Sequence, residues 1–375
     1  MSLFDVYPLF DITPVKAKDV FIYDENDVRY LDLYGGHAVV SIGHSHPEYV
    51  KNMSAQLSKL GFYSNSVQNP LQEKLADQLE VISGCTTYQL FLCNSGAEAN
   101  ENALKLASFH TSKKKVIAFK NGFHGRTSAA AAVTDNAKII APINAQQEVE
   151  LIPLGDTKTL EKALQKNDVC AVIIECIQGI GGLDESDTEF YKRAAHLCQK
   201  YEALFIADEI QSGFGRTGDF FAFQKHDIAP DIISMAKGMG NGFPVGGILI
   251  HPKIKASFGL LGTTFGGNHL ACTATLSVLS VLEKEHLMQH VYTISEYFTD
   301  KVAQITQVKK VKGRGLMLGL EFDFAIAALR KSLIRSHRIF TGNSKNPNLI
   351  RILPPLTVQQ EHFDRFFDAL KTELS

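Results

Sequence analysis

The middle of the chain alternates short, largely apolar runs with stretches of helical periodicity. The apolar runs are YQLFLC, KKVIAF, VCAVIIEC, ALFIADEI, DIISMAK and VGGILI, and helices are expected over residues 98–109 and 189–201. Strands that are apolar on both faces and are joined through helices are typical of a mostly parallel sheet covered by helices on both sides. The sequence therefore predicts an α/β fold, and the ligand-binding residues are expected at the carboxyl ends of the strands.

The pattern divides the chain into three predicted parts. Residues 49–265 contain the alternation and are expected to form a large domain. After about Thr275 come a long helix, the strand-like LMLGLEF, a helix near 325–336, the apolar LIRILPPL and a closing helix, so residues 266–375 predict a smaller α+β domain. Residues 1–48 are expected to form an N-terminal arm that packs on the small domain.

Composition narrows the class of protein. Lys and Arg total 38 against 40 Asp and Glu, a balance that offers no long-range attraction for nucleic acid or anionic lipid. No segment reaches about 18 consecutive apolar residues, so no membrane span is expected. The six cysteines form no CxxC pair, which favours free thiols and a cytoplasmic protein.

The segment NSGAEANENALKLA follows the first strand, and its Ser95, Gly96 and Ala97 directly precede the helix expected from residue 98. Small residues at a helix start present free N–H groups and the positive end of the helix dipole, which suits a phosphate group. An ordinary helix cap explains this segment alone equally well. The phosphate loop GxxxxGK[ST] is absent, and GRGLMLG lacks the GxGxxG spacing.

In NGFHGRT, Phe123 and Arg126 follow the next strand. A flat heteroaromatic cofactor could stack on Phe123, and Arg126 could bind a substrate carboxylate through paired N–H donors. Taken singly, the first is more often a core residue and the second a solvated charge.

The segment LFIADEIQSGFGRTG places Asp208 and Glu209 at the end of a buried strand, with Gln211 shortly after. Buried acids need a counter-charge, and a protonated pyridine nitrogen supplies one for Asp208. Gln211 could reach a ring hydroxyl. A metal-bound or salt-bridged carboxylate is the alternative, although no cluster of His or Cys ligands lies near in the sequence.

Lys237 ends the strand DIISMAK and precedes a glycine-rich stretch. Burial disfavours the ammonium form and frees the amine to form a Schiff base and to move protons. A lone lysine at a strand end is usually a surface residue.

Together these segments resemble the class III aminotransferases of pyridoxal phosphate (PLP) fold type I, and most closely their acetylornithine/succinylornithine branch. The resemblance also covers LDLYGGHAVVSIGHSHPE, LGTTFGGNHLA and LIRILPPL, and so most of the chain. It implies that Lys237 holds PLP as a Schiff base above Asp208. The other cofactor-binding residues that it implies are Ser95, Gly96, Ala97, Phe123, Gln211 and, from the partner subunit of a homodimer, Thr264.

The resemblance also implies substrate-binding roles for Arg126, Glu175, Thr263 and Arg351, and no metal. The implied reaction moves the δ-amino group of an N2-acylornithine to 2-oxoglutarate, in arginine biosynthesis. Ornithine, 4-aminobutyrate and a glutamate-semialdehyde aminomutase are alternatives within the fold. A nicotinamide-dependent dehydrogenase and a non-catalytic binding protein are alternatives outside it, and the missing GxGxxG argues against the first.

One position departs from the family pattern. Relatives commonly carry EPxQGExG, whereas this chain reads ECIQGIGG and has Ile180 at the second Glu. That Glu usually pairs with the arginine corresponding to Arg351. We therefore expect Arg351 to stay available in both half-reactions, which favours a donor with a succinyl over an acetyl group.

Overall fold

The computed structural model describes all 375 residues and contains three β-sheets. The largest has seven strands, of which β10 runs antiparallel to both of its neighbours while the strands from β9 to β6 run parallel. Its order across the sheet is β4 (Gln89–Cys93), β10 (Gly246–Ile250), β9 (Ile232–Met235), β8 (Leu204–Asp208), β7 (Val169–Ile174), β5 (Lys115–Phe119) and β6 (Val149–Ile152). The predicted mostly parallel sheet is confirmed.

Helices cover both faces of this sheet. Alternate residues of β7 enter two separate apolar clusters: Val172 and Ile174 lie in the larger, and Ala171 and Ile173 in the smaller. Helix α4 (Gly96–Thr111) packs on the smaller cluster and α7 (Thr188–Lys200) on the larger. Because every residue of β7 and β8 is buried, these strands carry no polar alternation, which is why their sequence is continuously apolar. The other helices of this part are α3 (Pro70–Ser83), α5 (Ser128–Ala132) and α6 (Thr157–Leu164).

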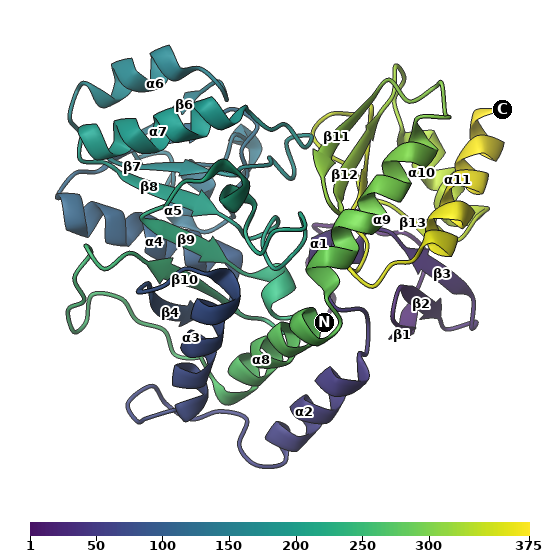
Figure 1. Cartoon of the computed structure of the whole chain (residues 1–375), viewed down its shortest axis with the longest axis horizontal. Helices are drawn as coiled ribbons and strands as arrows, with labels where there is room; N and C mark the ends of the chain where they lie inside the picture. Colours follow the sequence, from purple (N-terminus) through teal and green to yellow (C-terminus); the bar gives the residue numbers. More distant parts are fainter.

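Strands from the N-terminal part of the chain join elements of the C-terminal part in a second group, on the right of Figure 1. Strand β3 (Arg29–Asp32) pairs in parallel with β13 (Ile339–Phe340), and β1 (Pro14–Lys18) and β2 (Phe21–Asp24) extend that sheet. The third sheet joins β11 (Lys310–Arg314), β12 (Met317–Glu321) and β14 (Leu349–Ile352). Helices α10 (Ala327–Arg335) and α11 (Gln360–Leu374) complete the group. The domain boundaries at residues 48 and 265 stay a prediction, which limited proteolysis can test.

The prediction of a single long helix after Thr275 is wrong, because the chain forms two helices there. Helix α8 (His269–Lys284) starts earlier than expected, and α9 (Leu287–Val302) follows after a break. His286 adopts the left-handed region with φ 50°, which interrupts the helical backbone although the apolar periodicity continues. The helices α1 (Gly35–Ala38) and α2 (Pro47–Leu57) lie before the first strand of the large sheet. No helix has the length and apolar character needed to cross a bilayer.

Candidate active site

A cavity of about 430 Å³ lies where the parallel strands of the large sheet end. Its walls come from the segments that follow β4, β5, β7, β8 and β9, because parallel strands bring their carboxyl ends to one edge. The lining residues that the sequence singled out are Ser95, Gly96, Ala97, Phe123, Arg126, Glu175, Ile180, Asp208, Gln211 and Lys237. The structure thus brings together residues that lie far apart in the sequence.

One end of the cavity is the N-terminus of α4. The Ser95 hydroxyl accepts the N–H of Glu98 at 3.2 Å and caps the helix, while Gly96 and Ala97 occupy the first two helical positions. Their N–H groups have no intrahelical acceptor, as at every helix start. A Cβ on Gly96 would lie 2.8 Å from the Ile210 side chain, so glycine is needed for the close packing of this turn. The result is a cradle suited to an anion.

Glu175 fixes two loops of the cavity wall. Its Oε1 accepts the N–H of Phe123 at 2.9 Å, and its Oε2 accepts the N–H of Gly179 at 2.9 Å. Burial raises the pKa of Glu175, while the His124 charge and these two hydrogen bonds act against that rise. Both carboxylate oxygens are therefore engaged by the chain itself, and the side chain orients the loop that presents Phe123.

The two acids at the end of β8 serve different neighbours. Asp208 lines the cavity, and its Oδ2 accepts hydrogen bonds from Asn100 Nδ2 and His124 Nδ1, each at 2.7 Å. Glu209 lies outside the cavity, where it accepts the Ser212 hydroxyl at 2.7 Å and two backbone N–H groups, and burial raises its pKa to about 7. Only Asp208 is placed to meet a ligand.

Lys237 follows β9 and adopts a left-handed backbone conformation, with φ 49°. A non-glycine residue in this region is strained, and such strain is concentrated at functional sites. Burial lowers the pKa of Lys237, although the negative charges of Asp208 and Glu175 oppose the shift. The amine is thus closer to its neutral, nucleophilic form than a surface lysine is.

Arg351 does not line the cavity but lies behind it, fully buried on β14. Its Nη1 donates to Gly179 O at 3.0 Å and to Gln211 Oε1 at 3.3 Å, and its Nε donates to Asn343 O. Gln211 lines the cavity and therefore connects the cavity with the buried Arg351. All these acceptors are neutral oxygens.

The structure places the two predicted threonines elsewhere. The Thr263 hydroxyl accepts Asn94 Nδ2 at 3.3 Å and the Gly266 N–H at 3.1 Å, next to the start of α4. Thr264 is exposed, and neither threonine lines the cavity of its own chain.

Comparison with known proteins decides the family. A model described as aminotransferase class-III matches residues 5–374. The chain belongs to the class III aminotransferases. Among the relatives of this aminotransferase is the acetylornithine aminotransferase of Aquifex aeolicus, 38% identical over 98% of each chain. The succinylornithine transaminase of Photorhabdus laumondii is 36% identical over 96% of this chain and 93% of its own.

The solved structure of a relative supports PLP as the cofactor. The ornithine aminotransferase of Toxoplasma gondii, described with partial occupancy of PLP at the active site, has a TM-score of 0.89 and 27% identity over 97% of this chain and 90% of its own. PLP is the cofactor of the aminotransferase, and the cavity fits it. The start of α4 suits the phosphate, Phe123 offers a flat surface, and Asp208 and Lys237 offer a carboxylate and an amine within one cavity.

Two residues at the site were missed by the sequence analysis. Asn100 and His124 are buried and hold the same oxygen of Asp208. A signal existed for each: Asn100 lies on the buried face of α4 among alanines and leucines, and His124 lies between Phe123 and the glycine of FHGRT. A buried polar residue in such a place needs a partner.

Proposed function

We propose that this aminotransferase moves the δ-amino group of an N2-acylornithine, acetyl or succinyl, to 2-oxoglutarate and so forms the N-acylglutamate semialdehyde and glutamate. The observation that carries the proposal is one cavity that joins a lysine of lowered pKa, a buried carboxylate and an exposed arginine: Lys237, Asp208 and Arg126. The similarity to acetylornithine and succinylornithine aminotransferases over nearly the full chain supports the donor. Such a reaction belongs to arginine biosynthesis.

Asp208 and Lys237 carry the chemistry in this proposal. When bound, PLP supplies an electron sink that stabilises a carbanion at the donor carbon. Asp208 would pair with the ring nitrogen and keep it protonated, since Asn100 and His124 hold the carboxylate in place. The amine of Lys237 would hold the cofactor covalently and would move the proton at the donor carbon. Gln211 serves the ring hydroxyl, and Ser95, Gly96 and Ala97 bind the phosphate.

Two arginines give the site its preference for carboxylates. Arg126 is exposed on the cavity wall and binds the α-carboxylate of the donor. Arg351 binds a carboxylate of 2-oxoglutarate, and no carboxylate of the chain competes for it because Ile180 stands where the family commonly has glutamate. Glu175 and Thr263 shape the donor site by holding the Phe123 loop and the Asn94 turn.

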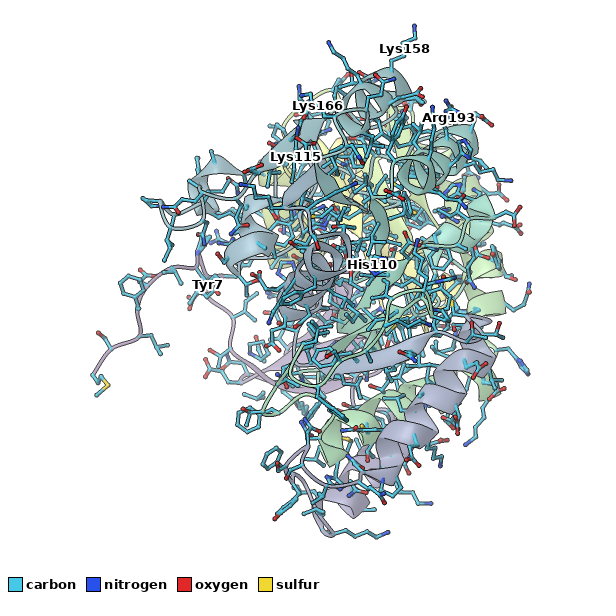
Figure 2. All side chains as sticks on the ribbon, turned by 90° about the vertical axis from the view of Figure 1, so that its left-hand side faces the viewer. Tyr7, His110, Lys115, Lys158, Lys166 and Arg193 are labelled. Atoms are coloured by element: carbon cyan, nitrogen blue, oxygen red, sulfur yellow. The ribbon has the colours of Figure 1, made fainter.

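We also propose that the aminotransferase is a homodimer with the active site at the interface. The first ten residues carry exposed apolar side chains, namely Leu3, Phe4, Val6, Tyr7, Leu9 and Phe10, and Figure 2 shows Tyr7 on an arm that leaves the body of the subunit. Phe258 and Phe265, on either side of the exposed Thr264, are exposed as well. Apolar surface of this extent is typical of a protein interface. In the dimer, Thr264 binds the phosphate in the site of the partner subunit.

The six cysteines are free thiols, five of them buried, which suits a reducing cytoplasm.

The donor is tested with N-acetylornithine, N-succinylornithine, ornithine and 4-aminobutyrate, each assayed against 2-oxoglutarate. We expect kcat/KM to be highest for an acylated ornithine, and a higher value for ornithine or 4-aminobutyrate would contradict the proposal. Sedimentation at several protein concentrations tests the dimer.

A further inference from the structure

Arg351 belongs to a closed ring of four residues, in which each residue contacts the next. Its Nη1 donates to Gln211 Oε1 at 3.3 Å, and Gln211 Nε2 donates to the carbonyl of His37 at 3.1 Å. The His37 imidazole is hydrogen bonded to the hydroxyl of Tyr34, and the Tyr34 ring lies 5.9 Å from Arg351 Cζ. Arg351, Gln211, His37 and Tyr34 therefore form the closed ring.

The backbone around this ring is built to place His37. Gly35, Gly36, His37 and Ala38 all have left-handed φ angles between 55° and 68°, which is strained for the two residues with a Cβ. A Cβ on Gly342 would lie 2.6 Å from the Tyr34 ring, so a glycine there lets the ring pack beside Arg351. The His37 side chain is exposed, and Nδ1 and Nε2 both lie within hydrogen-bond distance of the Tyr34 hydroxyl. That hydroxyl has one hydrogen and can donate to only one ring nitrogen, which leaves the other for a ligand.

The guanidinium at the centre lacks a counter-ion. Arg351 is 1% exposed, its hydrogen bonds end on the neutral oxygens of Gly179, Asn343 and Gln211, and its Nη2 donates no hydrogen bond within the chain. A buried cation without a carboxylate is costly, and a bound anion removes that cost. The ring is therefore prepared for a carboxylate from outside.

We propose that His37 is a specificity-determining residue for the 2-oxo acid. Together with Arg351, His37 binds the carboxylate that is next to the keto carbon. The proposal rests on the aminotransferase function above and names the residue that recognises the acceptor. Tyr34 is the positioning residue that orients the imidazole.

Electrostatics agree with this role. Burial and the positive charges of Arg351 and Lys237, the charged groups that act on His37, lower its pKa to about 4. His37 is thus neutral at pH 7 while the ring is empty, and adds no further positive charge beside the two cations. A carboxylate bound at Arg351 neutralises the positive charge of the guanidinium and raises the pKa of His37, so binding of the acceptor takes up a fraction of a proton.

The first experiment compares two carbonyl substrates on the same amino-charged enzyme. 2-Oxoglutarate has a carboxylate beside its carbonyl carbon, whereas the semialdehyde of the acylated donor has a hydrogen there. His37→Asn suits the left-handed backbone, and we expect it to lower kcat/KM for 2-oxoglutarate by about tenfold and for the semialdehyde by less than about twofold. Tyr34→Phe is expected to have the same selectivity with a smaller loss. Equal losses for both substrates, or none, would overturn the proposal.

The second experiment measures proton uptake. 2-Oxoglutarate is titrated by calorimetry into the PLP-loaded enzyme, which has no amino group to transfer, at pH 7 in two buffers of different ionisation enthalpy. The natural chain is expected to take up a fraction of a proton and His37→Asn none, while His110→Asn, at an exposed histidine of α4, matches the natural chain. Equal uptake by all three proteins would refute the role of His37. If the semialdehyde fails to react but the uptake pattern holds, the donor assignment is wrong and the acceptor site stands.

Discussion

His124 Nδ1 lies 2.7 Å from Asp208 Oδ2, and both side chains are almost fully buried. Burial alone would lower the pKa of His124, but the hydrogen bond to Asp208 and the negative charge of Asp208 outweigh burial and raise it. Asp208 thus holds the histidine closer to its charged form than burial alone would allow.

Replacing His124 should change the pH dependence of folding stability. The pKa of His124 is raised in the folded state, so its contribution is fully present below about pH 6.5 and is lost as the pH rises through the folded pKa. In the cofactor-free enzyme, His124→Asn should lower the free energy of unfolding by about 1–3 kcal/mol at pH 6 and by less at pH 9. Urea unfolding at both pH values measures this. A loss that is the same at both values would mean that the pair is not ionic.

Lys237→Ala should remove covalent cofactor binding and most of the activity. Without the amine, no group remains to form the Schiff base or to move the proton, so kcat should fall by roughly a hundredfold to ten-thousandfold. Borohydride reduction followed by peptide mapping should find the label on Lys237 in the natural chain and nowhere in the variant. Lys253→Ala, which removes an exposed surface lysine paired with Asp231, is the control and should be labelled normally. A label on any other lysine would refute the assignment.

Arg126→Ala should discriminate between donors. Loss of a charge-assisted pair costs about 1.5–3 kcal/mol, which corresponds to a roughly tenfold to hundredfold higher KM for an acylornithine. A donor without any carboxylate, such as a simple ω-amine, should be affected far less. The comparison of KM values for an acylornithine and an ω-amine decides the question, and equal increases would reject Arg126 as the α-carboxylate ligand.

Ile180→Glu should give Arg351 a partner within the chain. Gly179, whose carbonyl accepts from Arg351 at 3.0 Å, is the neighbour of Ile180, so a glutamate at position 180 starts close to the guanidinium. The natural chain, with Arg351 available, is expected to prefer N-succinylornithine to N-acetylornithine, and the variant to lose that preference. The ratio of the two kcat/KM values measures the effect, with Ile180→Gln as the uncharged control. A clear preference of the natural chain for the acetyl donor would defeat this hypothesis.

The sequence predicted the parts of the site that depend on local chemistry. The capped helix at Ser95, the acid that ends β8 and the lysine after β9 follow from apolar strands with polar ends, and the structure brings them into one cavity. It did not predict the partners of Asp208, because Asn100 and His124 come from separate segments that only the folded sheet brings together. The sequence did not predict the ring of contacts that includes Arg351 for the same reason, since Tyr34 and Arg351 belong to opposite ends of the chain. The break at His286 could not be foreseen, because apolar periodicity does not report a left-handed residue.

The parallel pairing of β3 with β13 has a consequence for synthesis on the ribosome. Strand β3 emerges early, but its partner is made only when almost the whole polypeptide has been translated. Until then the edge of β3 stays open, and it can recruit strands from neighbouring nascent chains. The turn that carries Tyr34 and His37 follows β3 directly, so the acceptor pocket is among the last features of the enzyme to mature.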